Sequence, residues 1–221
     1  MLVVEKPVNM PVQEDSSGDL DLLTACKDYL KEKYNKPGAV YLGLVHRLDR
    51  PVGGAMVFAR TSKAAGRLSD QLRRKEIQRS YLAVVRSQNF PSISPDQNWQ
   101  TLEDYLYKVR SKNQSYVVPA NHPQAKKAIL HYRCLETTKD LALLEIKLET
   151  GRSHQIRVQL SHIGLALWGD QKYDPKHNQP GQQLALWAHQ LCFKHPTKKD
   201  SLTFKSWPQG PIWQKFIKTK A

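Results

Sequence analysis

The feature of this sequence that most constrains its fold is a pair of alternating stretches between Ala128 and Glu149. Four alternate positions precede the dipeptide Lys139-Asp140 and four follow it: Ile129, His131, Arg133 and Leu135, then Leu141, Leu143, Glu145 and Lys147. A period of two is typical of a β-strand, because successive side chains point to opposite faces. Two such stretches joined by a short polar turn predict a β-hairpin, and a hairpin requires antiparallel pairing.

Short apolar runs and amphipathic runs predict the other elements. Further strands are expected at residues 2–4, 55–59 and 81–85 and within residues 184–204. Helices are expected after a cap at Asp19, from Thr61 or Ser62 to Lys75, from Gly151-Arg152-Ser153 to Gly164, and after Pro211. The polar, proline-containing stretch 88–99 predicts an exposed loop or a hinge between subdomains. Strands and helices do not alternate regularly, so the sequence predicts an α+β fold with a mixed, mainly antiparallel sheet flanked by helices.

The chain is strongly basic. Lys and Arg number 34 against 20 Asp and Glu, which gives a formal charge of +14. Such an excess favours a polyanionic partner such as a nucleic acid, because each neutralised phosphate releases condensed counterions. A charge that serves only solubility is the alternative that composition leaves open.

Three widely separated cysteines, Cys26, Cys134 and Cys192, form no C-x-x-C pair. This pattern fits neither a disulfide framework nor a zinc knuckle and is typical of a reducing cytoplasm. The apolar run at the start is too short for a signal peptide, and no run approaches the roughly 20 residues of a membrane span. The sequence therefore predicts a cytoplasmic protein without membrane association.

The first stretch whose side chains could take part in a reaction is 46–54, where Asp49 lies between Arg47 and Arg50. Neighbouring arginines favour the ionised carboxylate, which can act as a nucleophile or a general base. The proline and paired glycines that follow predict a tight loop leading into a strand. Taken alone, however, the stretch favours a surface cluster of salt bridges over a catalytic site.

Two further stretches carry polar side chains near predicted elements. Tyr81 begins an apolar strand, where a tyrosine is usually a core residue but can stack on a base if a nucleic acid lies nearby. The stretch 149–164 places four polar side chains in the first turns of a predicted helix: Arg152, His154, Gln155 and Arg157. The positive end of that helix predicts an anion-friendly surface. The two histidines of this stretch lie two turns apart without a carboxylate cluster, so no metal site is predicted.

Together these stretches resemble the three motifs of the RluA family of pseudouridine synthases. The matching residues are His-Arg-Leu-Asp-Arg (46–50), Arg-Ser-Tyr-Leu-Ala-Val-Val (79–85) and Gly-Arg-Ser-His-Gln-Ile-Arg-Val (151–158). Residues 167–173 resemble the Gly-Asp-x-x-Tyr block that follows these motifs, and residues 4–7 with Val12-Gln13 resemble the opening strand and turn. The matches occur in family order over almost the whole chain, and they overturn the salt-bridge interpretation of Asp49.

The resemblance implies an isomerase that converts specific uridines of ribosomal or transfer RNA to pseudouridine, with no metal or other cofactor. It implies a pseudouridine synthase-like fold with two subdomains around a central cleft. Asp49 matches the essential nucleophile, Tyr81 matches the tyrosine that packs against the target base, and Arg157 matches the basic residue that pairs with the catalytic aspartate. Attack on the sugar and a glycal intermediate both stay open as routes.

The resemblance also implies a set of RNA contacts. Arg47 matches the arginine that holds RNA open around a flipped nucleotide, and residues 107–112 are a candidate RNA-gripping loop, with a solvated charged turn as the alternative. The expected RNA-binding residues are Arg47, Arg50, Arg152, His154, Gln155, Arg110 and Lys112. Two departures from the family pattern, Pro51-Val52-Gly53-Gly54 and Trp168, are expected to alter the fit of the substrate.

Residues 1–221 are expected to form one pseudouridine synthase catalytic domain, without the N-terminal RNA-binding domain of many relatives. A monomer is expected, because no heptad pattern or self-complementary patch is visible. An RNA-binding or RNA-folding factor with lost or incidental catalysis is the alternative, motivated by the charge and by the altered residues after Asp49. A metal-dependent nuclease is more remote, because no convergent carboxylates are visible.

Overall fold

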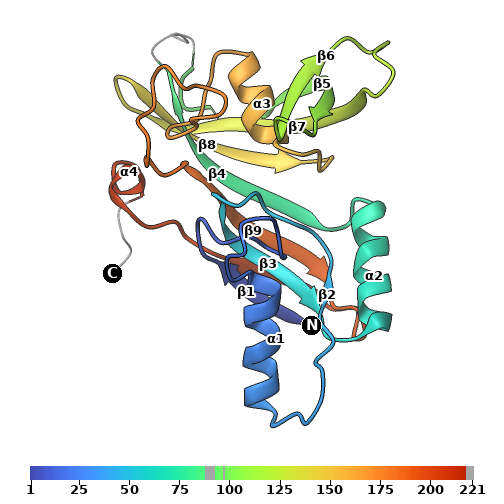
Figure 1. Ribbon diagram of the computed structural model, residues 1–221. Coiled ribbons are helices and arrows are strands. Elements are labelled where there is room, and N and C mark those ends of the chain that lie inside the picture. Colours follow the sequence, from blue (N-terminus) through green and yellow to red (C-terminus); the bar gives the residue numbers. More distant parts are fainter. Residues whose placement is uncertain (88–92, 97, 218–221) are drawn as a thin grey trace. The chain divides into compact units, whose positions relative to one another are not determined.

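The computed structural model describes residues 1–87, 93–96 and 98–217, which fall into two compact units (Figure 1). Unit 1 consists of residues 1–79 and 188–207, and unit 2 consists of the described residues within 80–187 and from 208 onward. The boundaries fall inside two continuous strands and after Trp207. No unit boundary falls within residues 88–99, so the hinge interpretation of that stretch is wrong. Its described residues, 93–96 and 98–99, have no helix or strand and are mostly exposed, as the loop interpretation predicts. Residues 88–92 and 97 of that stretch lie outside the described residues.

Unit 1 is built on antiparallel strands. Their bounds are β1 Leu2–Lys6, β2 Gly43–Leu44, β3 Gly53–Ala59, β9 Leu186–Lys194 (from Ala188 onward) and β10 Ser201–Lys205. β3 pairs with β1 and with β2, and β9 pairs with β10. All residues of β3 are buried. In the β1–β3 register Lys6 lies opposite Gly54, so the end of β1 meets the residues that follow Asp49.

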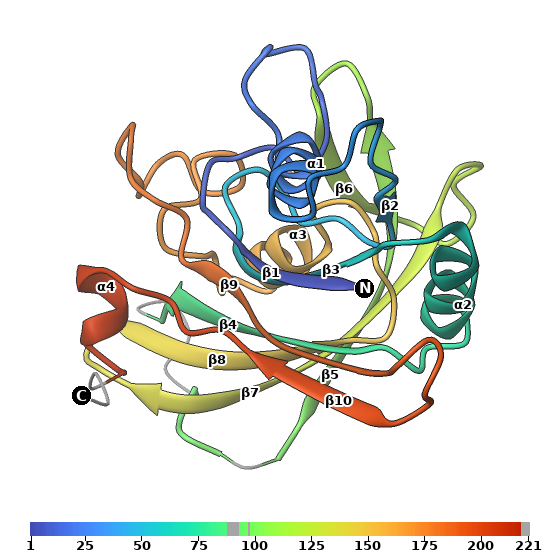
Figure 2. The same ribbon diagram turned by 90° about the horizontal axis from the view of Figure 1, so that it is seen from below.

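Helix α1 (Leu22–Lys33) belongs to unit 1 and is seen end-on in Figure 2. It begins at Asp21, whose carboxylate accepts a hydrogen bond from the backbone N–H of Thr24 at 3.0 Å. The expected cap at Asp19 is wrong, because the Asp19 carboxylate pairs with the guanidinium of Arg50 instead. Both aspartates have the right chemistry for a cap, so local sequence could not choose between them.

Helix α2 (Ser62–Arg73) begins as predicted at Thr61, whose hydroxyl accepts a hydrogen bond from the N–H of Ala64 at 3.1 Å. Its apolar side joins a core cluster with alternate residues of β3, centred on the fully buried Leu68. Burial of a leucine side chain stabilises a fold by about 1.5–3 kcal/mol. This cluster fixes β3 in unit 1, and β3 carries the Asp49 loop at its start.

Unit 2 is built on further antiparallel strands and two helices. Its elements are β4 Gln78–Arg86 (from Ser80 onward), β5 Gln100–Val109, β6 Gln114–Val118, β7 Lys126–Thr137, β8 Leu141–Leu148, α3 Gln155–His162 and α4 Pro211–Gln214. The strand order is β4-β8-β7-β5-β6. The β7–β8 pair confirms the predicted hairpin around Lys139-Asp140. The β5–β6 hairpin was not predicted.

Helix α3 begins later and is more deeply buried than expected. Every residue from Gln155 to Leu160 is buried, and His154 before it is buried too. The prediction of an anion-friendly surface at this helix is therefore wrong. Of the four polar side chains that were expected to form it, only that of Arg152 is exposed. Gly164 follows the helix with φ 85°, so it ends the helix as predicted.

The expected α+β class with a mainly antiparallel sheet is confirmed, and the chain divides into two units. The central cleft between subdomains stays a prediction. In the part of the chain that the structure describes, no helix has the length and apolar character of a membrane span.

Candidate active site

Asp49 lies in the connection between β2 and β3 of unit 1. The side chains of Leu48 and Val52 are buried on either side of it, while Asp49 keeps partial exposure. The N–H of Val52 donates to the carbonyl of Asp49 at 2.9 Å, which closes a turn. The loop therefore presents a carboxylate that is accessible and is held by an apolar anchor on each side.

Gly54, the second of the two glycines that follow Asp49, has a packing role. Gly54 has φ 120°, and a Cβ atom built on it would lie 2.3 Å from the carbonyl oxygen of Ala188 on β9. No side chain fits such an approach, so the start of β3 requires glycine. This requirement explains one part of the unusual stretch after Asp49.

Lys6, at the end of β1, was missed as a site residue. Its side chain is 0% exposed, and its ammonium donates to the carbonyls of Pro7 at 2.8 Å and Arg50 at 2.9 Å. Burial lowers the pKa of Lys6 to about 8, with the nearby charge of Asp49 raising it and that of Arg50 lowering it. Lys6 thus ties the first strand to the Asp49 loop. The one feature of the sequence that could have indicated this role is the position of Lys6, a charged residue at the end of an apolar strand.

His46 opens the same motif as a neutral, buried side chain. Its Nε2 atom accepts a hydrogen bond from the backbone N–H of Val57 at 3.3 Å. Burial, together with the charge of Arg79, lowers the pKa of His46 to about 3. At neutral pH the imidazole is therefore uncharged and braces the loop against β3.

The two arginines of the motif have different surroundings. Arg47 is exposed. The Arg50 guanidinium donates to the carbonyl of Asn9 at 3.1 Å and to the hydroxyl of Ser17 at 2.9 Å, and it pairs with Asp19. Arg50 therefore holds the 9–19 loop beside the motif. RNA contact by either arginine stays a prediction.

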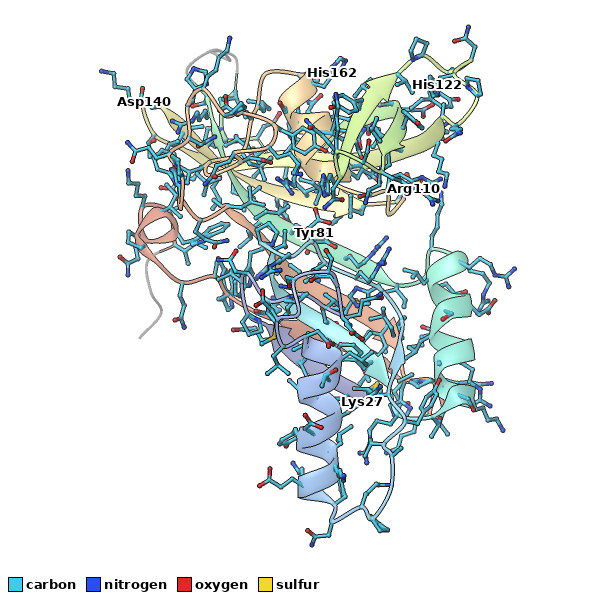
Figure 3. The ribbon with its side chains drawn as sticks, viewed as in Figure 1. Lys27, Tyr81, Arg110, His122, Asp140 and His162 are labelled. Carbon is cyan, nitrogen blue, oxygen red and sulfur yellow. The ribbon has the colours of Figure 1, made fainter. Side chains whose placement is uncertain are left out.

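In unit 2, Tyr81 lies on β4, opposite Ile146 of β8, and its side chain is buried (labelled in Figure 3). Arg157 on α3 forms a bidentate salt bridge with Asp170, with Nε–Oδ2 at 2.8 Å and Nη2–Oδ1 at 2.7 Å. Both side chains are buried. Sequence reasoning expected Arg157 to pair with the catalytic aspartate and did not assign Asp170 to the site.

The Arg157–Asp170 pair is extended by Tyr173, which was also missed. The guanidinium of Arg157 lies 5.2 Å from the centre of the Tyr173 ring. The Tyr173 hydroxyl accepts a hydrogen bond from the N–H of Ser115 at 2.9 Å and lies 2.9 Å from Nδ1 of His154. The Gly-Asp-x-x-Tyr block therefore orients Arg157 and joins α3 to the β5–β6 hairpin.

Gln155 and Arg152 form hydrogen bonds that hold the loop before α3 in place. The Gln155 amide accepts from the hydroxyl of Thr150 at 2.8 Å and donates to the carbonyl of Ile129 at 3.0 Å. Arg152 donates to the carbonyl of Lys127 at 2.8 Å while staying exposed. These bonds hold the loop before α3 against the start of β7. Support of a catalytic site and contact with RNA by these residues stay predictions.

Arg110 and Lys112 lie in the turn of the β5–β6 hairpin and are exposed (Arg110 is labelled in Figure 3). The carbonyl of Lys112 accepts from the ammonium of Lys172 at 3.4 Å. The predicted loop is thus a hairpin turn flanked by strands, because residues 107–109 belong to β5.

Trp168, the second departure from the family pattern, packs against a core cluster of unit 2. The guanidinium of Arg86 lies 4.6 Å from the centre of the Trp168 ring. Its size therefore fills space within unit 2, and an effect on substrate fit stays a prediction.

Among the described residues, no group of three or more His, Cys, Asp or Glu side chains could hold a metal ion. The three cysteines are free thiols. Asp49, Arg47 and Arg50 belong to unit 1, and the other expected site residues belong to unit 2. The structure brings together Arg157 and His154 around Tyr173; the meeting of Asp49 with Tyr81 and Arg157 stays a prediction.

The architecture is that of pseudouridylate synthase domains. The human RNA pseudouridylate synthase domain containing 4 superposes with a TM-score of 0.73 at 22% identity, covering 93% of this chain and 84% of that chain. The human domain containing 1 gives 0.70 at 20% identity, covering 98% and 82%. At this identity the likeness defines the fold.

The sequence adds the family. The family described as RNA pseudouridylate synthase matches residues 1–162, so the chain belongs to this family, and it has the features of an RluA-type catalytic domain. It is 34% identical over 211 residues to the Bacillus subtilis protein named uncharacterized RNA pseudouridine synthase YlyB, covering 93% of this chain and 65% of that protein. It is 35% identical over 181 residues to ribosomal large subunit pseudouridine synthase D of Yersinia pestis, covering 81% and 52%. The chain thus spans between half and two thirds of the length of these relatives.

Proposed function

We propose that this protein is an RNA pseudouridine synthase that isomerises specific uridines of ribosomal or transfer RNA, with Asp49 as the nucleophile. The observation that carries the proposal is the Asp49 loop. Its carboxylate is partly exposed between two buried anchors, and a buried lysine ties the loop to β1. Family membership and the net charge of +14 support an RNA substrate.

The reaction requires a base to leave its stack and turn over. The bond between N1 of uracil and C1′ of ribose breaks, the base rotates, and a bond between C5 and C1′ forms, with loss of the C5 proton and protonation of N1. Extrusion of a base costs a few kcal/mol, which basic side chains on the phosphates can offset. In this proposal Asp49 attacks C1′ or assists formation of a glycal, and Tyr81 packs against the base.

Arg157 is proposed to supply positive charge near Asp49, as it does in the family pattern. Its pairing with Asp170 means that it would be oriented before any RNA binds. Orientation in advance favours catalysis, because less reorganisation is needed in the transition state. No step of this route needs a metal or a redox cofactor.

The test is Asp49→Asn, which keeps the shape of the side chain and removes its charge. We expect pseudouridine formation to fall by about 1,000-fold or more, while RNA affinity changes less than about threefold, because a nucleophile is lost and few RNA contacts are. Asp140→Asn, in the exposed β7–β8 turn labelled in Figure 3, is the matched control and should keep full activity. Near-normal activity of the Asp49 variant would refute the proposal.

The alternative function is that of an RNA-binding or RNA-folding factor. Mapping pseudouridines in cellular RNA with and without the protein distinguishes it from the proposed enzyme. A missing pseudouridine supports the enzyme, and an RNA-folding defect with every pseudouridine present supports the alternative. We further propose that residues 1–221 act as one catalytic domain, that the protein is a monomer and that it works in the cytoplasm. Sedimentation of the purified chain tests the monomer, and cell fractionation tests the compartment.

A further inference from the structure

Exposed aromatic side chains gather in one segment of unit 1. Three tyrosines between β1 and β2 are about half exposed: Tyr29 at 49%, Tyr34 at 47% and Tyr41 at 50%. Large apolar rings are normally buried, and a group of exposed rings on one surface indicates an interaction site.

Two of these rings are each paired with a cation. The ammonium of Lys33 lies 5.1 Å from the centre of the Tyr29 ring and donates to its hydroxyl at 2.7 Å. The guanidinium of Arg60 lies 4.5 Å from the centre of the Tyr34 ring and donates to its hydroxyl at 3.2 Å. A cation that covers part of each ring and leaves about half of the side chain accessible keeps ring surface open for a ligand.

The two pairs form a single aromatic–cation cluster, which we define as Tyr29, Lys33, Tyr34 and Arg60. Lys33 is the last residue of α1 and Tyr34 follows it directly as the C-cap, so the two pairs adjoin at the end of this helix. The cluster joins the end of α1 to the end of β3.

Tyr29 and Lys33 are four residues apart and share one side of α1. Glu32 is three residues from Tyr29 and lies on the same side, whereas Asp28 lies about 100° away from Tyr29 around the helix axis. The side of α1 that carries Tyr29 therefore presents a ring and a cation with one carboxylate beside them. Lys27, labelled in Figure 3, adds a further cation to the same helix.

The cluster lies far from Asp49 within unit 1. β3 starts next to the Asp49 loop and ends directly before Arg60. Seven residues of strand at roughly 3.3 Å each give about 23 Å between the two ends. An RNA strand at roughly 3.4 Å per stacked nucleotide needs about seven nucleotides to span that length.

We propose that the aromatic–cation cluster binds a single-stranded segment of the substrate RNA, several nucleotides away from the target uridine. Bases stack on the open surfaces of Tyr29 and Tyr34, and phosphates contact Lys33 and Arg60. Alternating rings and cations match the alternating bases and phosphates of a single strand. A duplex or an acidic peptide would use the cations and leave the rings without a role. This inference rests on the proposed function only in taking the bound RNA to be the substrate.

The test measures RNA binding in the Asp49→Asn background, so that turnover plays no part. The probes are a short stem–loop that carries a uridine and the same stem–loop extended by about ten unpaired nucleotides at each end. We expect the extension to tighten binding, and Tyr29→Ala with Tyr34→Ala to abolish that gain, a loss of at least about tenfold. Binding of the short stem–loop should stay unchanged.

Four companion variants separate the contribution of the rings from that of the cations. Tyr29→Phe with Tyr34→Phe keeps the rings and should retain most of the gain. Tyr41→Ala removes an equally exposed ring that lies beside Gly43 and should retain it fully. Lys33→Ala with Arg60→Ala should reduce it, whereas Lys198→Ala with Lys205→Ala, two exposed cations of the β9–β10 region, should not.

The proposal is overturned if the double alanine variant keeps the gain, if Tyr41→Ala loses as much, or if only the cation variants lose it. The last result would indicate phosphate contact without stacking. Failure of the proposed function is read separately, as a map of pseudouridines in cellular RNA that does not change when the protein is removed.

Discussion

At the scale of single residues, Lys6 is the least expected feature of the site. A lysine with no exposure is unfavourable unless its ammonium is hydrogen-bonded, and both of its carbonyl partners lie in loops beside Asp49. Burial first, and the charge of Arg50 in addition, lower the pKa of Lys6 from 10.5 to about 8, while Asp49 counteracts them. Lys6 therefore titrates within an accessible pH range.

This titration gives a prediction for Lys6→Met. Between pH 8 and 10.5 the unfolded chain binds a proton at Lys6 that the folded chain has released, so folding stability from this group rises with pH. The free energy of unfolding of the wild type minus that of the variant should increase by about 1–3 kcal/mol across this interval. Urea unfolding at several pH values measures it.

Other titrating groups cancel in that difference. Lys198→Met, at an exposed position of unit 1, is the control and should show no such increase. A difference for Lys6→Met that stays flat from pH 7.5 to 10.5 would show that the amine is not buried.

Some site residues could be predicted from the sequence and others could not, for a physical reason. Asp49 was predicted as a loop residue before a strand because its arginine and glycine neighbours are local. Asp170 was not assigned, because its pairing with Arg157 spans 13 residues and depends on how α3 packs. Lys6 resembles any lysine at the end of a strand, and only the fold buries it.

At the scale of elements, the start of β3 is constrained by its close approach to β9. Gly54 has φ 120°, and an added Cβ would lie 2.3 Å from the Ala188 carbonyl. Gly54→Ala should therefore lower the free energy of unfolding by about 3 kcal/mol or more, because a backbone contact must shift. Thermal and urea unfolding measure the loss, and activity should fall with it because the Asp49 loop adjoins this glycine.

Gly66 offers the opposite control within the same unit. It lies in the interior of α2, and a Cβ added there meets no atom within 4 Å. Gly66→Ala should raise stability by about 0.5–1 kcal/mol, because alanine restricts the unfolded chain and favours a helix. If both substitutions had the same sign of effect, the close approach at Gly54 would not be what constrains that position.

Elements with a strong local signal were predicted well. The β7–β8 hairpin follows from its alternation, and α2 follows from Thr61 and its apolar side. The β5–β6 hairpin was missed, because half-buried strands at the edge of unit 2 carry mixed polar sequences. The start of α1 was predicted two residues too early. Asp19 pairs with Arg50 in the folded chain, and Asp21 caps the helix instead.

At the scale of the whole molecule, the net charge of +14 follows directly from the amino-acid composition and belongs to no single helix or strand. Charge of this size acts on RNA through released counterions, and its effect depends on salt. The aromatic–cation cluster and the exposed arginines 47, 110 and 152 lie on several elements and in both units. Phosphate contacts should therefore be distributed over the chain.

The salt dependence of RNA binding tests this distribution. For six to ten phosphate contacts on a single strand, the logarithm of the binding constant should fall with the logarithm of salt concentration with a slope of about −4 to −7. Lys33→Ala with Arg60→Ala removes two proposed contacts and should reduce the steepness by about 1.4, since each contact contributes roughly 0.7. Tyr29→Phe with Tyr34→Phe keeps the charge and should leave the slope unchanged. Filter binding of the extended RNA from 50 to 400 mM salt (about an eightfold range) gives these slopes. A shallow slope for the wild type would mean that the excess positive charge serves solubility and that stacking, rather than phosphate contact, holds the RNA.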